Sequence, residues 1–320
     1  MSLEKRIDEQ LTRRAFLWLN ARSMAERFPK DTAQQRTYRA FETLIAREDA
    51  SIDLAQAALL IASIEYPDLD MAQYLLHLDA LARRVQAILA LPPPEILAEL
   101  PPESKPLKVI AAMNKVLFEE EGFQGNKADY YNPNNSFFNK VLDNRTGIPI
   151  TLSLLYMEVG KRVGIQIDGI ALPYHFMVRC HLPEGPIYID AFEGGTQMSE
   201  RECRERIRHL THSRTKLSAH WFEPVNPKIF LARMLNNLKK CYLEQEDYVR
   251  MLAISDLIII LVPHFPSEWR DRGIVHMQLQ HYSRALQDLL TYLDLAPKAN
   301  DRSEILNHIK TIRQIMAMMN

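Results

Sequence analysis

The sequence is short of glycine and cysteine, and it has neither a long apolar run nor an excess of charge of one sign. It contains ten glycines and three cysteines in 320 residues. No Gly-rich phosphate loop and no H-E-x-x-H pattern occurs, which argues against P-loop enzymes and zincins. The cysteines form no C-x-x-C pair, which argues against a disulfide framework and a zinc site. The 39 basic and 40 acidic residues balance, so bulk charge does not indicate a nucleic-acid or membrane-surface partner.

The lack of apolar runs also bears on location. Residues 1–14 are charged and lack the apolar core of a signal peptide. The longest apolar runs, such as Leu257–Val262, are far too short to cross a bilayer. Sparse, unpaired cysteines fit a reducing compartment. We therefore expect a cytoplasmic protein that uses no metal or cofactor and has no nucleic-acid or membrane partner.

What the sequence does contain is mostly helical in pattern. Leu, Ala, Ile, Glu and Arg dominate, and apolar residues recur at helical spacing over residues 54–62 and 74–82. Between these helices, Pro67 and Asp70 predict a break and then an Asp N-cap. Prolines crowd residues 92–106, which predicts a connector. It is either a loop within one domain, the interpretation we prefer, or a divide between two.

The middle of the chain is predicted as a helix, a loop and two further helices. A helix is expected over residues 108–120, and the Gly-, Asn- and Pro-dense residues 122–135 indicate a loop. Ser136 is expected to cap a short helix through Leu142, with Gly147 as the residue that stops it. The next helix, over 149–163, begins with proline, which is favoured at the first helical position.

The apolar period changes to two in one region only. Alternation over short segments, with turns between them, predicts a small sheet at about residues 165–192. After it, Ser199 and Glu202 form an S-x-x-E capping box that predicts the start of another helix. The three predicted strands are 165–172, 175–182 and 186–190.

An internal repeat of 34 residues occupies the C-terminal region. Thirty-four residues is the tetratricopeptide period, with a proline closing each helix pair. The other interpretation is an ordinary pair of helical hairpins with coincident spacing. Two units bury too little surface alone, so we expect them to dock on the preceding part of the chain, with a helix over 303–318 as a cap. The matching pairs are Tyr248 and Tyr282, Leu252 and Leu286, Leu261 and Leu295, and Pro263 and Pro297.

A family resemblance appears between residues 147 and 195. The helix 149–163 leads through Arg-Val-Gly-Ile into strands that carry His175, in Pro-Tyr-His-Phe-Met-Val, and Asp190, in Ile-Tyr-Ile-Asp-Ala-Phe. This resembles the core of the transglutaminase-like superfamily, where a helix begins with a nucleophilic Cys and the following strands bear a His and an Asp. More narrowly, the chain looks like the SirB-type family, which joins such a core to C-terminal repeats. Further stretches that fit are 135–142, 233–238 and 270–273.

The resemblance implies an α+β fold that is predominantly helical. A transglutaminase/papain-like core with a small antiparallel sheet is expected first, followed by an α-helical region of tetratricopeptide-like repeats. We place the N-terminal helices and the core at residues 1–222 and the repeats at 223–320.

The chain departs from this family at the nucleophile. Counting back from Gly164 by the usual helix length places the Cys position at Pro149, which has no nucleophilic group. A helix N-terminus that lowers a thiol pKa, and a His that takes the proton, have nothing to act on. Cys180 is an odd number of strand residues from His175, so it is expected to face the other way. Ser153 shares the face of Pro149 but lies one turn, about 5.4 Å, deeper.

His175 and Asp190 remain as a dyad. They are expected to be neighbours across paired strands, with the carboxylate orienting the imidazole. Three interpretations stay open: a structural hydrogen bond, a retained binding groove, and general-base catalysis. Metal binding is not expected, because His181 lies six residues from His175, about 20 Å along a strand.

Residues near the dyad are further candidates. Asn135, Ser153 and Tyr174 are expected to bind a ligand in the groove, and the tyrosines at 130–131 are expected to line it. In so polar a segment, turn formation is the other interpretation for residues 130–135. The basic run at 201–216 is either a site for an anion or acidic partner, or a solvated helix face.

Three functions are compatible with these patterns. The one we favour is a non-catalytic adaptor or scaffold that binds a protein or peptide partner through its repeats. The second is a cysteine-independent amidase, peptidase or acyl transferase that uses His175 and Asp190 with water or Ser153. The third is a sensor that holds a peptide or small ligand in the remaining cleft.

Overall fold

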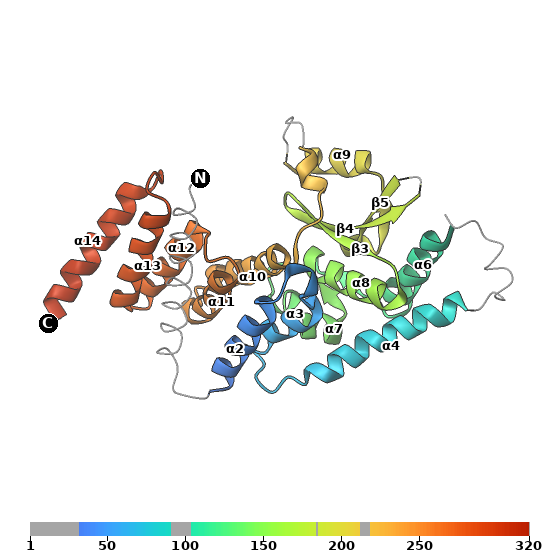
Figure 1. Ribbon diagram of the computed structural model, residues 1–320, viewed down its shortest axis with the longest axis horizontal. Coiled ribbons are helices and arrows are strands. Elements are labelled where there is room, and N and C mark those ends of the chain that lie inside the picture. Colours follow the sequence, from blue (N-terminus) through green and yellow to red (C-terminus); the bar gives the residue numbers. More distant parts are fainter. Residues whose placement is uncertain (1–31, 91–103, 184, 212–217, 320) are drawn as a thin grey trace, which may run out of the picture.

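The computed structural model describes residues 32–90, 104–183, 185–211 and 218–319 (Figure 1). Most of the proline-rich segment, up to residue 103, lies outside the described residues. Helices make up most of the described chain, and its strands form a four-stranded antiparallel sheet and a short parallel pair. The predicted α+β, predominantly helical fold is confirmed. Among the described helices, none combines the length and the apolar character that a bilayer crossing requires.

Within residues 32–90, three α-helices precede the proline-rich segment: α2 (Ala33–Ile45), α3 (Leu54–Ala62) and α4 (Met71–Leu89). The last two match the predicted helices, and each begins with an aspartate that caps it. The Asp53 carboxylate accepts a hydrogen bond from the Gln56 amide at 2.9 Å. Asp70, as predicted, accepts one from the Ala72 amide at 3.0 Å. Both caps satisfy amides that the first helical turn leaves unpaired.

The helix predicted over residues 108–120 is present. It consists of α6 and a wider π-helical turn that continues it. The loop after it holds a 3-10 turn and a short strand, which pairs in parallel with another one. The bounds are α6 (Ser104–Asn114), the π-helical turn (Lys115–Glu120), β1 (Gln124–Gly125), the 3-10 turn (Pro133–Asn135) and β2 (Thr146–Gly147).

The start of the next helix differs from the prediction. Helix α7 (Phe138–Asn144) has Phe137 at its N-cap and no side-chain cap, so the expectation that Ser136 caps it is wrong. Ser136 instead ends the 3-10 turn before it. Its amide donates to the Pro133 carbonyl at 2.9 Å, so Ser136 is the last residue of the preceding turn and not the first of α7.

The end of α7 also differs from the prediction. The helix stops at Arg145, in the left-handed conformation with φ of 54°, and not at Gly147. The Arg145 carbonyl accepts from the Gln124 amide at 2.9 Å, and its guanidinium lies 2.9 Å from Glu121. These tertiary contacts hold the strained backbone. Gly147 serves close packing, because a Cβ there would lie 2.8 Å from the Thr151 hydroxyl oxygen.

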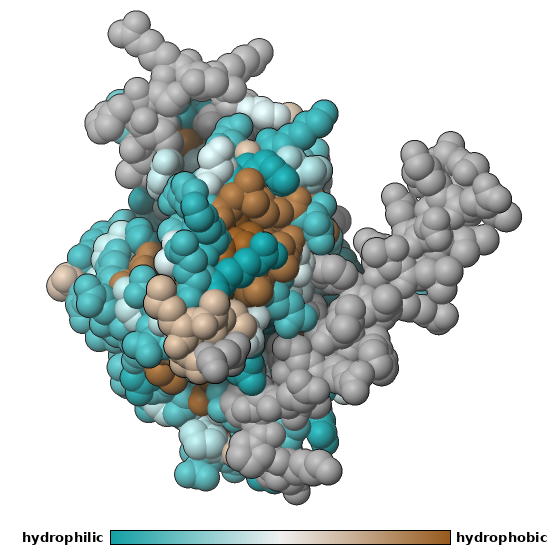
Figure 2. All heavy atoms as spheres, turned by 90° about the vertical axis from the view of Figure 1, so that its left-hand side faces the viewer, coloured by the Kyte–Doolittle hydropathy of each residue, from teal (hydrophilic) through white to brown (hydrophobic). Residues whose placement is uncertain are grey.

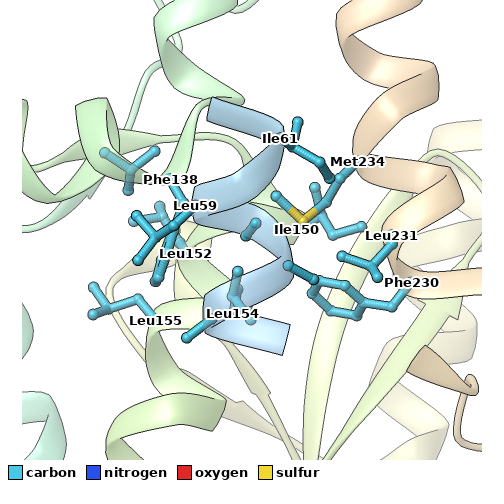
Figure 3. Close-up of a cluster of buried hydrophobic side chains, with 14 of the residues drawn as sticks. Leu59, Ile61, Phe138, Ile150, Leu152, Leu154, Leu155, Phe230, Leu231 and Met234 are labelled. Carbon is cyan, nitrogen blue, oxygen red and sulfur yellow. The ribbon is translucent and has the colours of Figure 1, made fainter. Parts of the chain in front are cut away.

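Helix α8 (Pro149–Val163) lies at the centre of the molecule. As predicted, proline occupies its first turn, and the helix ends at Gly164, with φ of 87°. It packs against α4 on one side and strands β3 and β4 on the other. Figure 3 shows how apolar side chains of α3, α7, α8 and α10 meet there: Leu59, Ile61, Phe138, Ile150, Leu152, Leu154, Leu155, Phe230, Leu231 and Met234.

The antiparallel sheet has the order β3-β4-β5-β6, with β3 (Ile167–Leu172), β4 (His175–Leu182), β5 (Gly185–Asp190) and β6 (Thr196–Met198). The first three match the predicted strands. Strand β6 was not predicted, because its three residues are mostly exposed and carry no apolar alternation. One sheet face, which includes Phe176 and Val178, joins the core around α8. The other face, with Met177 and Tyr188, packs with residues of α9 (Glu200–Thr211).

The predicted capping box at the start of α9 is confirmed. The Ser199 amide donates to the Glu202 carboxylate at 2.7 Å, and the Glu202 amide lies 3.3 Å from the Ser199 hydroxyl oxygen. A 3-10 turn (Ala219–Phe222) then leads into the C-terminal helices.

Five helices complete the fold: α10 (Pro227–Glu244), α11 (Tyr248–Leu261), α12 (Pro266–Gln278), α13 (Tyr282–Leu295) and α14 (Arg302–Met319). Helices α11 and α13 begin and end 34 residues apart, as the repeat predicts. The last helix matches the predicted cap. Gly273 of α12 lies against α13, since a Cβ there would approach Leu289 to 2.9 Å.

The first repeat shares a core with the N-terminal helices. Leu257 of α11 belongs to the same apolar cluster as the buried residues of α2 and α3, and the Tyr38 hydroxyl donates to the Ala253 carbonyl at 3.0 Å. A second cluster, around Trp269, holds α12, α13 and α14 together and includes Ile259 of α11. The repeats therefore dock on the preceding part of the chain. The division at residue 222 stays a prediction.

Candidate functional site

His175 and Asp190 lie together at one end of the sheet. His175 begins β4, after a tight turn in which Tyr174 has φ of 60°, and Asp190 ends β5. The imidazole Nε2 lies 2.8 Å from Oδ2 of Asp190, and the side chains are 9% and 0% exposed. Since a carboxylate only accepts, Nε2–H donates. Nδ1 remains to accept a proton or a hydrogen bond, and no described residue bonds to it.

The Asp190 carboxylate is the centre of this arrangement. Three hydrogen-bond donors converge on it, the His175 imidazole and the backbone amides of Phe192 and Glu193 at 3.1 and 3.3 Å, and the Arg206 guanidinium forms an ion pair with it at 3.1 Å. The two amides belong to a 3-10 turn (Ala191–Glu193) that Asp190 caps. These bonds compensate the burial of a charged group and fix the imidazole orientation.

Arg206 was not singled out from the sequence. It belongs to the basic run at 201–216, of which residues 212–217 lie outside the described part of the chain. The helical spacing could have indicated which residues of this run face the sheet, since the apolar pair Cys203 and Ile207 lies on the buried face of α9. Arg206 lies next to that face and reaches Asp190 with its side chain 31% exposed.

Pro149 occupies the position that the resemblance assigns to the nucleophile. It is buried in the first turn of α8. This helix packs against β4 and against the turn that Asp190 caps. Phe192 of that turn contacts the His175 ring edge-to-face, with centroids 6.4 Å apart. Helix α8 therefore packs beside the strand and the turn that carry the dyad, and a proline stands where the resemblance puts the nucleophile.

Ser153 and Cys180, the hydroxyl and the thiol weighed as replacements for the nucleophile, are both buried. Ser153 has no exposed surface, and its hydroxyl has no partner among the described residues. Cys180 belongs to the core cluster around α8, whereas Met177, which shares the strand face of His175, belongs to the opposite cluster. Cys180 therefore faces away from the imidazole, as predicted, and burial raises the pKa of its thiol.

The other thiols are no better placed. Cys203 lies under the sheet with its sulfur 3.8 Å from that of Met177. Burial and the Asp190 charge raise the pKa of Cys203 to about 12. Burial raises the pKa of Cys241 to about 11. At neutral pH both remain thiols, which are poor nucleophiles.

The Asn135 side chain, expected to bind a ligand, is bonded to its own loop instead. It is buried, and its amide donates to the carbonyls of Asp129 and Tyr130 at 2.7 and 3.2 Å and accepts from Asn126 at 3.1 Å. Its backbone carbonyl accepts from the Thr151 hydroxyl at 2.7 Å. Asn135 thus ties the loop to α8 and sets the position of the tyrosines in it.

The aromatic residues near the dyad form a connected group. Tyr130 contacts Tyr131 and Phe192 edge-to-face, with ring centroids 5.4 and 6.1 Å apart. Tyr130 and Tyr131 are 36% and 43% exposed, and Tyr174, at the tip of the turn before His175, is 84% exposed. Three large aromatic side chains thus reach solvent on the loop and the turn that flank the dyad.

Cations from α10 reach the same place. The Arg233 guanidinium donates to the carbonyls of Leu172 and His175, each at 3.2 Å. Lys240 donates to the Tyr131 hydroxyl at 2.9 Å, and its Nζ lies 4.5 Å from the ring centroid. Sequence reasoning marked the stretch 233–238 but gave it no role, because nothing local connects α10 to a turn some sixty residues earlier.

No metal site is built from these residues. In the described ranges, no three His, Cys, Asp or Glu side chains are close enough to share an ion. His181 pairs with Asp168 at 2.8 Å, away from His175. A small pocket in the described structure lies elsewhere, where Gln34, Tyr242 and Arg250 meet.

Comparison with known proteins assigns both parts of the chain. Residues 72–236 match the transglutaminase-like superfamily, and residues 238–310 match the tetratricopeptide repeat family. This bears out both halves of the expected architecture. The narrower SirB-type label is not a name that the similar proteins carry, although their makeup is consistent with it.

Curated relatives cover most of the sequence. A "UPF0162 protein" of Xylella fastidiosa is 36% identical over 272 residues, which span 84% of this chain and 93% of that protein. A "UPF0162 protein" of Vibrio cholerae is 30% identical over 187 residues, 58% of this chain and 69% of that protein. Human "F-box only protein 21" is 40% identical over 140 residues, 41% of this chain and 21% of that protein. The chain therefore belongs to the UPF0162 family, whose transglutaminase-like core is followed here by tetratricopeptide repeats.

Proposed function

We propose that this chain is a non-catalytic adaptor, which binds polypeptide partners and uses its transglutaminase-like core as a scaffold. The observation that carries the proposal is Pro149 at the start of α8. Thiol chemistry in such a core needs a thiolate at the helix N-terminus beside a His. Here the His and its carboxylate partner are in place, and the group they would activate is absent.

A cysteine-independent enzyme is the competing proposal. It would need His175 to activate water or a hydroxyl. Ser153 is fully buried one helical turn below Pro149, so a substrate cannot reach it without opening the core. The dyad geometry itself is compatible with a general base, and activity assays have to separate the two proposals.

The repeats supply a surface for partners. Figure 2 views the molecule from the end that carries α13 and α14, and apolar side chains gather there among polar ones. Large exposed apolar patches mark interaction sites in proteins. A cytoplasmic location is part of the proposal, since the three cysteines are free. The exposed apolar residues of these two helices are Leu290, Leu295, Leu306, Met318 and Met319.

The catalytic half of the proposal is tested by restoring the thiol. The wild type, Pro149→Cys, and Pro149→Cys with His175→Ala are each incubated with a reactive thioester, and acyl adducts are measured by mass spectrometry. We expect no adduct on the wild type, an adduct on the introduced thiol of the first variant, and slower formation in the second. Turnover by the wild type that His175→Ala abolishes, with folding intact, would establish the enzyme instead.

The binding half is tested by surface substitutions that leave the fold intact. Leu290→Glu with Leu306→Glu places charges on the repeat surface, and Leu76→Glu does the same on α4, where the residue is 62% exposed. Partners captured from cytosol by the full chain should be lost with the repeat variant and kept with the α4 variant. Equal capture by all three proteins would contradict binding through the repeats.

A further inference from the structure

Arg233 carries a charge that no carboxylate in the described part of the chain neutralises. Its guanidinium is half-buried, 5.5 Å above the Phe176 ring, and its bonds go to two backbone carbonyls. Burial lowers the pKa of Arg233. No described carboxylate lies within ion-pair distance of it. A partly buried cation without an anionic partner is costly, so an external anion would be bound with a gain.

Other arginines of similar burial are paired. Arg162 lies 2.8 Å from Asp79, Arg206 lies 3.1 Å from Asp190, and Arg179 lies 2.8 Å from the Asp168 carboxylate. Each of these has a carboxylate as its counter-ion. Arg233 differs from these three in having backbone carbonyls as its hydrogen-bond partners.

Lys240 extends the same cationic face. It lies seven residues after Arg233 on α10, so the two side chains share a face about 10 Å apart along the helix axis. Lys240 donates to the Tyr131 hydroxyl, and no described carboxylate is within ion-pair distance of it. The nearby acids are Glu244, one helical turn after Lys240, and Asp129, which accepts from an asparagine amide at 2.9 Å. The hydrogen bond to Tyr131 and, after it, the Glu244 charge raise the pKa of Lys240.

The tyrosines of the loop stand beside these cations. The charges of Arg233 and Lys240 both act on the Tyr130 phenol, which places all three side chains in one neighbourhood. Tyr130 and Tyr131 are partly exposed. Exposed tyrosines next to an arginine are the composition of polypeptide recognition surfaces, since the rings supply contact area and the guanidinium binds carboxylates in a fixed geometry.

We propose that Arg233 and Lys240 form a carboxylate-binding site for a bound polypeptide, whose chain lies against Tyr130 and Tyr131. The carboxylate belongs to an Asp or Glu side chain or to a C-terminus. The site lies where the transglutaminase-like core meets α10, beside His175. This inference rests on the proposed function and adds the chemistry of the partner.

The test uses the full chain and an array of ten-residue peptides. Each peptide is present with Asp and Glu or with Asn and Gln in their place, and with a free or an amidated C-terminus. Dissociation constants of the binders are measured by fluorescence anisotropy for the wild type, Arg233→Gln, Lys240→Gln and Lys228→Gln. The last variant is the matched control, since Lys228 is on α10 and pairs with Asp49 at 3.0 Å.

We expect carboxylate forms to bind the wild type more tightly than their neutral forms. Arg233→Gln should weaken the carboxylate forms about tenfold or more, because a charge-assisted bond is lost. Lys240→Gln should weaken them by a smaller factor, and it covers the case that Arg233→Gln does not fold. Lys228→Gln should bind as the wild type does. Whether side-chain or terminal neutralisation matters identifies the source of the carboxylate.

Equal binding of charged and neutral forms, or no peptide binding at all, would overturn the inference. So would carboxylate binding that neither Arg233→Gln nor Lys240→Gln weakens. These failures differ from failure of the proposed function. If the wild type turns over the thioester while acidic peptides still require Arg233, the site stands as a substrate site and the adaptor proposal fails.

Discussion

The Asp190 carboxylate holds several parts of the candidate site in place. Its carboxylate accepts hydrogen bonds from His175 of β4 and from the turn that follows it in the chain, and it forms an ion pair with Arg206 of α9. The same group therefore orients the imidazole, anchors α9 and starts the turn that carries Phe192. At the residue scale, a catalytic-looking carboxylate also has a structural task.

Replacing Asp190 with Ala should lower the free energy of unfolding by about 3–5 kcal/mol, because the buried donors lose their acceptor. Urea denaturation followed by circular dichroism measures the change. Asp190→Asn is the control and should cost less, since it keeps an acceptor for the turn amides. A loss below about 1 kcal/mol for Asp190→Ala would mean that water replaces the carboxylate.

Asp168 gives a pH-dependent contribution to stability. Burial alone would raise the pKa of Asp168, but hydrogen bonds from Arg179, His181 and Gln166 outweigh it and lower the pKa. A depressed pKa stabilises the fold above the unfolded value of about 3.9, and the contribution is lost as pH falls below it.

The stability difference between the wild type and Asp168→Asn should therefore be larger at pH 7 than at pH 3. Urea unfolding at both pH values measures it. Asp294→Asn, at an exposed position of α13, is the control and should show little difference at either pH. A gap that widens at pH 3 would contradict the assigned direction.

At the scale of elements, local signals were predictable and tertiary ones were not. The Asp70 cap, the proline that opens α8 and the box at Ser199 depend on neighbours within a few residues, and each is present. The end of α7 at Arg145 depends on a strand pair and an ion pair from elsewhere in the chain.

The candidate site divides in the same way. His175 and Asp190 came from a motif resemblance, and the strand register then places them in contact. Arg206 and Arg233 come from helices whose docking no local pattern encodes. A sequence reveals which groups exist more readily than which ones fold against them.

Helices α11, α12 and α13 are joined by a buried ionic group. Arg272 stands where the tetratricopeptide pattern W-x-x-L-G has leucine, after Trp269 and before Gly273. Its guanidinium binds Asp288 at 2.7 Å and Asp256 at 3.0 Å, all three side chains being buried. Charge thus fills a position that other repeats fill with an apolar side chain.

Arg272→Leu should destabilise the repeats by about 3–5 kcal/mol, because it removes the cation from two buried carboxylates. Adding Asp256→Leu and Asp288→Leu should recover most of that loss. Thermal unfolding of the three proteins measures this, with the exposed Arg302→Leu as control. A triple variant less stable than Arg272→Leu would show that the ionic group is favourable in its own right.

At the scale of the whole molecule, one apolar core runs from the sheet to the first repeat. Phe230 of α10 belongs to it and contacts Phe176 of β4, with ring centroids 5.0 Å apart. Ile309 of α14 belongs to the separate cluster of the terminal helices. The core and the first repeat should therefore unfold as one unit.

Phe230→Ala should cost about 3–5 kcal/mol and weaken hydrogen-exchange protection in both β4 and α11. Ile309→Ala should cost about 2–5 kcal/mol and weaken protection mainly in α13 and α14, with β4 unchanged. Exchange measured by mass spectrometry on peptides of each element distinguishes the two. If Phe230→Ala left α11 as protected as in the wild type, the shared core would not be cooperative.

Pro149 also acts on the chain before it folds. Its ring fixes one backbone angle, so the unfolded ensemble has fewer conformations to lose, a gain of about 0.4–1 kcal/mol where the native geometry fits. The first turn of α8 fits that geometry. Replacing cysteine by proline at this position therefore raises the free energy of unfolding, and replacing proline by cysteine lowers it. At position 149, a side chain that supplies a thiol and a side chain that stabilises the fold therefore exclude each other.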